Sequence, residues 1–164
     1  MIDRRVFLAG TGVAIVALAI GLDPFGDVEA AAPATDPRFR LTDAEWKKRL
    51  TAGQYNVLRR SATEAPFSSP LDKEHRKGVF QCAGCALPLY SSATKFDSGT
   101  GWPSFYRPLP RAVGTSVDHE LGYARTEVHC ARCGGHLGHV FDDGPPPTGK
   151  RYCMNGVALR FVAA

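Results

Sequence analysis

The chain has 164 residues, 22% of them charged, and its formal net charge is only +4. This length suits one domain with a short extension, and the apolar fraction of 44% is ordinary for a globular protein. The sequence lacks the dense Lys and Arg runs with interleaved aromatic residues that a nucleic-acid-binding surface needs, so we expect no nucleic-acid partner.

Residues 1–32 predict an export signal. Arg4 and Arg5 come first, an uncharged run of apolar and small residues covers 9–22, and three alanines at 30–32 suit cleavage. Paired arginines ahead of Phe-Leu are typical of a twin-arginine signal. The run is shorter than the ~20 residues of a membrane span. We therefore expect a periplasmic protein, with an uncleaved N-terminal membrane anchor as the alternative.

A linker and a capped helix follow the leader. Residues 33–40 contain two prolines and predict a linker, so we expect the folded domain to occupy residues 41–164. Thr42 followed three residues later by Glu45 is a capping-box pattern, which predicts a short helix over residues 43–50.

A second short helix is expected over residues 52–60. Thr51 precedes it, and a threonine hydroxyl can accept a hydrogen bond from the free N–H groups of a first helical turn. Tyr55 and Leu58 are three residues apart, so they would share the inward face. Prolines that follow soon afterwards prevent any further helix.

From residue 78 onward, strand and turn signals predominate. Over residues 123–129, Ala, Thr and Val alternate with Arg, Glu and His, which is the period of a strand with two different faces. The Asp-Asp-Gly-Pro-Pro-Pro sequence at 142–147 predicts a rigid loop, because proline is excluded from a sheet interior. Further strands are expected at residues 79–82, 87–90, 112–117 and 157–162.

Two Cys-x-x-Cys pairs predict a metal site with four sulfur ligands. Cys82 and Cys85 form the first pair, and Cys130 and Cys133 form the second. Four thiolates presented by two tight turns suit tetrahedral zinc, which here would be one structural ion. Two alternatives stay open at this point. An exported protein can form disulfides, and iron in a sulfur tetrahedron would make a small electron carrier.

The fifth cysteine, Cys153, has no obvious partner. An odd cysteine in an exported protein is an inert buried thiol, an intermolecular link or a reactive group. Arg151 lies two residues before Cys153 and Asn155 two residues after it, so a strand would present all three on one face. The guanidinium of Arg151 would hold a thiolate and lower the pKa of the Cys153 thiol.

Two further features lie near these cysteines. His136 and His139, flanked by glycines, follow the second cysteine pair; they are either structural residues or proton donors. Trp102 and Phe105 surround a proline and are either core residues or the wall of an apolar substrate pocket.

Several of these motifs, in this order, resemble the B-type methionine sulfoxide reductases. The resemblance covers residues 41–161. The motifs that carry it are Thr-Lys-Phe-Asp-Ser-Gly at 94–99, Gly-Trp-Pro-Ser-Phe at 101–105, Cys-x-x-Cys at 130–133, His-Leu-Gly-His-Val-Phe at 136–141 and Arg-Tyr-Cys-Met-Asn at 151–155. Residues 64–67 and 71–72 also resemble the N-terminal part of that family.

The resemblance implies a mainly β, rolled fold of two antiparallel sheets with short N-terminal helices and a four-cysteine zinc knuckle. It implies reduction of the R epimer of methionine sulfoxide in oxidised proteins. Cys153 would be the nucleophile, Trp102 would line the pocket for the substrate methyl group, and His136, His139 and Asn155 would shape the sulfoxide end.

One departure from the family concerns regeneration of the enzyme. Many members carry a resolving cysteine where this chain has Thr100. With four cysteines committed to metal, we expect no internal disulfide in the cycle, and an external, thioredoxin-like thiol would reduce the sulfenic acid on Cys153. We expect a monomer. The competing interpretation, a non-enzymatic zinc module with a basic binding surface, leaves Cys153, the histidine pair and Trp102 unexplained.

Overall fold

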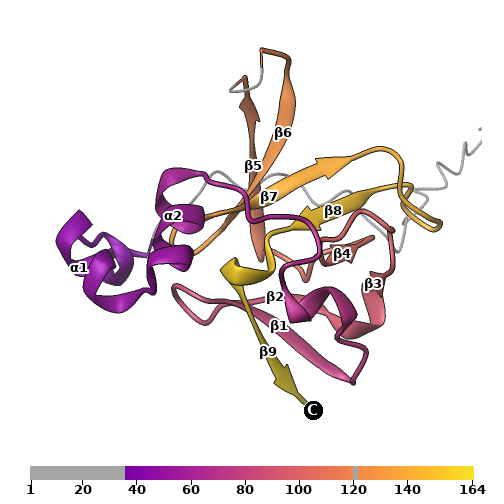
Figure 1. Cartoon of the computed structure of the whole chain (residues 1–164), viewed down its shortest axis with the longest axis horizontal. Helices are drawn as coiled ribbons and strands as arrows, with labels where there is room; N and C mark the ends of the chain where they lie inside the picture. The colour runs from indigo at the N-terminus through magenta and orange to yellow at the C-terminus, as the bar shows by residue number, and fades with distance from the viewer. Residues whose placement is uncertain (1–35, 120–121) are drawn as a thin grey trace, which may run out of the picture.

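The computed structural model describes residues 36–119 and 122–164 (Figure 1). The expected leader and most of the expected linker lie outside these residues. The two α-helices, both short, lie near the start of the described chain: α1 (Asp43–Arg49) and α2 (Ala52–Arg60). Both begin with a complete capping box, formed by Thr42 with Glu45 and by Thr51 with Gln54. Both helices confirm the prediction, and no described helix is long and apolar enough to cross a membrane.

The described chain also contains nine strands and four 3₁₀ helices, connected by turns and loops. The strands are β1 (Gly78–Cys82), β2 (Pro88–Ser91), β3 (Lys95–Phe96), β4 (Ser104–Phe105), β5 (Val113–Asp118), β6 (Arg125–Cys130), β7 (His136–Phe141), β8 (Arg151–Met154) and β9 (Leu159–Ala163). The 3₁₀ helices are η1 (Pro37–Phe39), η2 (Pro70–Lys73), η3 (Ser92–Thr94) and η4 (Gly156–Ala158). The proline-rich loop at 142–147 contains no strand, as its composition predicts.

The strands form two open, antiparallel sheets. One has three strands in the order β2-β1-β9, and the other has six in the order β3-β4-β8-β7-β6-β5. The predicted mainly β fold with two antiparallel sheets and short N-terminal helices is therefore confirmed. The last strand was predicted at residues 157–162 but begins at Leu159, because η4 turns the chain from the larger sheet to the smaller one.

The six-stranded sheet has two unlike faces, and their register is set by direct cross-strand pairing. Side chains of paired residues project to the same face, and neighbours along a strand project to opposite faces. The core face includes Phe105, Tyr152 and Met154. The other face, called the polar face below, carries a row of paired residues, one from each of five strands: Ser104, Cys153, His139, Glu127 and Ser116.

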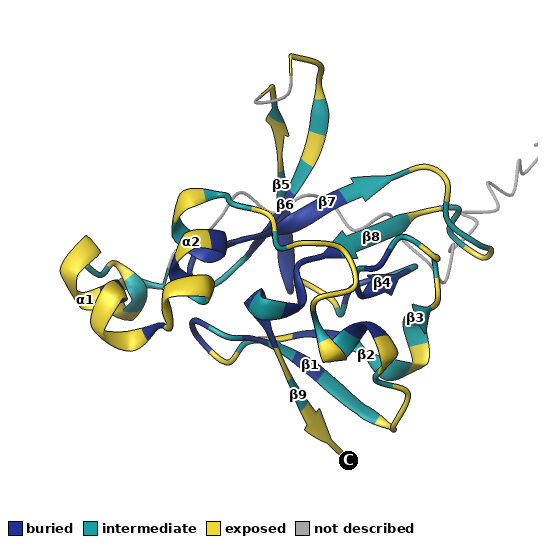
Figure 2. Ribbon diagram, viewed as in Figure 1, coloured by how far each residue is buried: buried dark blue, intermediate teal, exposed yellow. Residues whose placement is uncertain are grey.

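Aromatic side chains fill the space between the two sheets. Tyr90 stacks on Phe105 with ring centroids 4.3 Å apart, and Phe80 meets the edge of Phe105 at 5.0 Å. All three are completely buried. Figure 2 shows this buried centre and the exposed outer half of the β5–β6 hairpin, which extends away from the rest of the molecule. The predicted inward residues of α2, Tyr55 and Leu58, are both buried.

Candidate functional site

The four cysteines of the two Cys-x-x-Cys pairs meet in one buried cluster. Their sulfur atoms all lie within 4.8 Å of one another; Cys82 and Cys133 are 3.7 Å apart, and Cys85 and Cys130 are 3.5 Å apart. Four sulfurs at the usual ~2.3 Å from a central zinc ion would be about 3.8 Å apart, so the cluster has the size of a tetrahedral site. The thiols are free rather than joined as the disulfides that the sequence left open.

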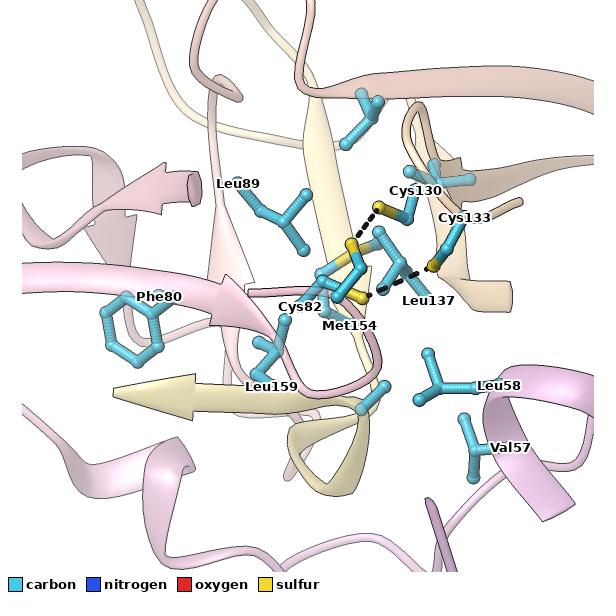
Figure 3. Packing of buried hydrophobic residues seen from close by; sticks show 14 of the residues in the cluster. Val57, Leu58, Phe80, Cys82, Leu89, Cys130, Cys133, Leu137, Met154 and Leu159 are labelled. Carbon is cyan, nitrogen blue, oxygen red and sulfur yellow. Dashed lines mark hydrogen bonds between the residues drawn. The ribbon is translucent and has the colours of Figure 1, made fainter. Parts of the chain in front are cut away.

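Matching turns present the two cysteine pairs. The residue after each pair, Ala86 or Gly134, has a positive φ, and its N–H donates to the carbonyl of the first cysteine of the pair at 2.9 Å. Leu58 of α2 packs against the second turn, where a Cβ atom at Gly135 would be only 3.0 Å from it. Figure 3 shows Leu58, Leu137 and Met154 around the sulfur atoms. Helix α2 therefore covers the cysteine cluster.

The ionisation of these thiols fits a cation. The pKa values of Cys82 and Cys133 are raised, chiefly by their interaction with the nearby Cys130 sulfur, whose own pKa is lowered, chiefly by Cys133. Four thiolates this close and this buried would repel one another, so a divalent cation is required before all four can ionise. The four residues would hold such an ion without any further ligand.

Cys153 lies away from this cluster, on the polar face of the sheet. Strand β8 alternates, so Tyr152 and Met154 project into the core while Cys153 projects to the other side and remains half-buried. The Tyr90 hydroxyl donates to the Met154 sulfur at 3.1 Å, which anchors the core side of the strand. The metal site and Cys153 therefore lie on opposite faces of one sheet.

Hydroxyl groups surround the Cys153 sulfur. Thr100 Oγ1 is 4.0 Å from it, and Ser104, which pairs with Cys153 across the strands, lies beside it. The Ser98 hydroxyl lies 2.8 Å from those of both Thr100 and Ser104. Ser98 and Ser104 were not identified from the sequence as site residues. Both lie inside motifs that carry the family resemblance, at 94–99 and 101–105, but the motifs alone did not indicate that their hydroxyls lie beside Thr100 and Cys153.

Arg151 does act to lower the pKa of the Cys153 thiol, as expected, but it does not set the net shift. Burial raises the pKa of the Cys153 thiol, and this outweighs the opposing effects of Arg151, Thr100 and Ser104. The Arg151 guanidinium is directed mainly to Asp143, with two bonds of 2.8 Å, and stacks over Phe141. The resting Cys153 is therefore a thiol at neutral pH.

A β-bulge brings His136 and His139 together. Residues three apart on a regular strand project to opposite faces, but the pairing of β7 with β6 shifts register beside Leu137. His139 pairs with Glu127 and His136 with His129, so both imidazoles lie on the polar face, with ring centroids 5.4 Å apart. Gly138 is required here because a Cβ atom would be 2.1 Å from the Cys153 carbonyl oxygen.

Each histidine is held by a carboxylate that the sequence analysis had not assigned to the site. His139 Nε2 is 2.6 Å from Asp118, which also pairs with Arg125, and His136 Nδ1 is 2.7 Å from Glu127. The bond from His136 lowers the pKa of Glu127 to about 2. The alternation of residues 123–129 did place Arg125 and Glu127 on one face, but nothing in it indicated their partners.

Burial lowers the pKa of His139 and outweighs the opposing effect of Asp118, so this imidazole is neutral at neutral pH. A carboxylate only accepts hydrogen bonds, so Nε2 of His139 carries the hydrogen and Nδ1 is the basic nitrogen.

Glu64 joins Trp102 to Asn155. Its carbonyl accepts the indole N–H of Trp102 at 3.1 Å, and its own N–H donates to Asn155 Oδ1 at 2.9 Å. Its carboxylate accepts the N–H groups of Gly156 and Val157. The Asn155 amide donates to Leu137 in β7. One residue from the segment between α2 and η2 therefore positions two predicted site residues.

Phe105 does not reach this site. Its side chain is completely buried and packs between Phe80 and Tyr90 on the core face. Phe105 is the neighbour of Ser104 in β4, so when Ser104 projects beside Cys153, Phe105 must project away from it. The core interpretation is therefore correct for Phe105, whereas Trp102 is only partly buried.

Comparison with known proteins shows the family. A profile of the SelR domain matches residues 50–163. The chain is 52% identical over 128 residues to the peptide methionine sulfoxide reductase MsrB of Agrobacterium fabrum, an alignment covering 77% of this chain and 95% of that protein. The MsrB of Pseudomonas syringae is 53% identical over 126 residues, covering 76% and 96%. That of Methanosarcina barkeri is 55% identical over 121 residues, covering 73% and 85%. The chain therefore belongs to the MsrB family of peptide methionine sulfoxide reductases.

Proposed function

We propose that this chain reduces methionine (R)-sulfoxide in oxidised proteins to methionine, with Cys153 as the nucleophile. Membership of the MsrB family makes it an oxidoreductase that acts on methionine sulfoxide. The observation that supports the cysteine mechanism is the division of the five cysteines. Four lie in the metal cluster, and the fifth is half-buried on the polar face opposite His139.

The proton needed for the reaction can come from Cys153 itself. Burial keeps the thiol protonated and His139 neutral, so His139 Nδ1 can take the thiol proton as substrate binds, while Asp118 stabilises the resulting imidazolium. The thiolate attacks the sulfoxide sulfur, and the proton passes to the sulfoxide oxygen. The S–O bond then breaks, the oxygen bonds to the Cys153 sulfur as a hydroxyl group, and the bond between the two sulfur atoms breaks. Methionine leaves with two more electrons on its sulfur, and Cys153, which has lost those two electrons, is a sulfenic acid.

Two residues held by Glu64 are proposed to receive the substrate. The indole of Trp102, fixed through its N–H, would contact the substrate methyl group. Asn155, held between Glu64 and Leu137, would orient the sulfoxide end together with His136. Arg151 projects to the same face of β8 as Cys153, two residues away, and with Asp143 it would cover one side of the reacting sulfur.

Regeneration would use an external thiol. Thr100 Oγ1 lies 4.0 Å from the Cys153 sulfur, at the position that a resolving thiol would need to occupy. The four other cysteines lie together in the metal cluster. The sulfenic acid would therefore persist until a thioredoxin-like reductant attacks it. We also propose that the chain acts as a monomer outside the cytoplasm, after twin-arginine export or on an N-terminal anchor.

The metal proposed for the cluster is one structural zinc ion. Its chemistry would be limited to holding the two turns together, since four thiolates complete a tetrahedron and the site lies behind the sheet that carries Cys153. Elemental analysis should find about one zinc per chain in colourless protein. Red protein with visible absorbance would indicate iron instead.

The test is a single-turnover assay with a peptide containing methionine sulfoxide of defined stereochemistry. Wild-type protein should convert the R epimer, leave the S epimer, and yield a dimedone adduct on Cys153. Cys153→Ser should be inactive. Thr100→Cys should replace the adduct with a disulfide between residues 100 and 153. Turnover by Cys153→Ser, or a wild-type disulfide to a metal-cluster cysteine, would refute the mechanism.

A further inference from the structure

An exposed aromatic residue lies at the edge of the site and has no role in the proposed chemistry. The side chain of Phe67 is 66% exposed, although Glu64, three residues before it, makes several hydrogen bonds inside the site. Isolated exposed apolar residues are common and need no explanation by themselves. Two backbone observations set Phe67 apart.

The first observation is the turn that presents Phe67. Ser68 N–H donates to the Ala65 carbonyl at 3.3 Å, which makes Phe67 the third residue of a four-residue turn. Its φ is +62°, a left-handed conformation that glycine and asparagine adopt readily and a bulky residue rarely does. The backbone would be less strained with glycine or asparagine at this position. The turn therefore gives no reason for a phenylalanine here, and the reason must lie in the phenyl ring itself.

The second observation is the attachment of Phe67 to the loop that carries Trp102. Its N–H donates to the Gly101 carbonyl at 2.7 Å, and a Cβ atom at Gly101 would lie 2.9 Å from the phenyl ring. Gly101 is the link between Thr100, which touches the Cys153 sulfur, and Trp102. Figure 1 shows the segment between α2 and η2 crossing beside β4 and β8. The ring is therefore held at the edge of the reacting centre while most of its surface stays open.

We propose that Phe67 is a substrate-selecting contact, which binds an apolar side chain next to the oxidised methionine in a peptide. This rests on the proposed function of the Cys153 site. Aromatic rings gain most from aromatic or aliphatic partners, so the favoured substrates carry such a residue beside the methionine sulfoxide. Free methionine sulfoxide has no flanking side chain and cannot use the contact.

The test compares three substrates of the R epimer: a short peptide with phenylalanine beside the sulfoxide, the same peptide with glycine there, and N-acetylmethionine sulfoxide. Wild-type protein should favour the phenylalanine peptide over the glycine peptide in kcat/KM by about three- to tenfold. Phe67→Asn tolerates the left-handed backbone, so it should fold with an unchanged or higher Tm and reduce this ratio to near one. Its activity on N-acetylmethionine sulfoxide should be unchanged.

Phe67→Leu should keep most of the preference, and Tyr123→Ala, which removes an aromatic residue of similar exposure (58%) on the β5–β6 hairpin, should keep all of it. Equal losses on all three substrates in Phe67→Asn would show a structural role and overturn the inference. A wild-type protein that is active on all three but indifferent to the flanking residue would also overturn it. A wild-type protein inactive on every substrate would refute the proposed function instead.

Discussion

Cys153 and His139 lie directly opposite each other on neighbouring antiparallel strands, so their side chains project together from the polar face of the larger sheet. His139 is in turn bound to Asp118, two strands further along the sheet. The Cys153 sulfur, the His139 imidazole and the Asp118 carboxylate thus lie in order on one face of β8, β7, β6 and β5, and the backbone pairing of these four strands fixes that order.

Replacing His139 with alanine should therefore lower kcat/KM for methionine (R)-sulfoxide by about 10²- to 10⁴-fold, the usual contribution of a general acid–base group. The protein should stay folded with a modest loss of Tm, because His139 is buried outside the hydrophobic core and Asp118 keeps its pair with Arg125. Single-turnover rates measured from pH 6 to 9 check this. Full turnover in His139→Ala would remove the residue from the mechanism.

The reactivity of Cys153 should depend on pH and on Arg151. Burial raises the pKa of the thiol, so the thiolate fraction, and with it the rate of alkylation, should still be rising above pH 8.5. Arg151 opposes this shift, so Arg151→Met should raise the pKa further and slow alkylation at pH 8 roughly threefold or more. Arg151→Lys, which keeps the positive charge, is the matched control.

The measurement is the rate of iodoacetamide labelling of the peptide that contains Cys153, followed by mass spectrometry on protein with its metal bound. A wild-type midpoint below pH 7 would contradict the raised pKa, and equal rates in Arg151→Met and Arg151→Lys would contradict the role given to the charge.

The sequence predicted the elements well because its signals there are local. Thr42 with Glu45, and Thr51, mark the two helix starts, and both caps form with side chains three residues away. The four cysteines positioned to bind a metal ion could also be predicted, since each pair spans a single turn. These signals need no knowledge of the rest of the fold.

The polar face could not be predicted to the same depth, because its contacts join strands distant in the chain. Asp118 reaches His139 across two strands, and Glu64 reaches Asn155 across 91 positions. The bulge beside Leu137 determines that His136 projects to the polar face. In the sequence, Gly138 was the only indication of a bulge in this strand. The motif at 101–105 indicated that Phe105 lines a substrate pocket. Neighbouring residues of a strand project to opposite faces, so the Phe105 ring lies in the core while Ser104 lies beside Cys153.

Loss of the metal should unfold the region where α2 meets the cysteine cluster. Cys130→Ser removes one of four ligands from a buried site that Leu58 and Leu137 cover, so the protein should lose its metal and its Tm should fall by more than ~10 °C. Thermal unfolding with and without a strong chelator checks this. Cys153→Ser, which keeps all four ligands, should retain both metal and Tm. Unchanged stability after complete metal removal would contradict a structural role.

Glu64 offers the sharpest test of how the site is held. Its carboxylate accepts two backbone N–H groups at the start of η4, and its main chain bonds Trp102 and Asn155. Glu64→Gln keeps the shape but replaces one acceptor oxygen with a donor, which faces an N–H group. The free energy of unfolding should fall by about 1.5–3 kcal/mol, the usual worth of hydrogen bonds to a charged group.

The same change should raise KM more than it lowers kcat, because it loosens Trp102 and Asn155 while leaving Cys153 and His139 in place. Asp142→Asn is the control, since that carboxylate is 83% exposed and pairs with Lys150 at the surface. Asp142→Asn should lower the free energy of unfolding by less than ~1 kcal/mol and leave kcat and KM unchanged. If Glu64→Gln lowered kcat alone, with KM unchanged, Glu64 would act on the chemical step rather than on substrate positioning.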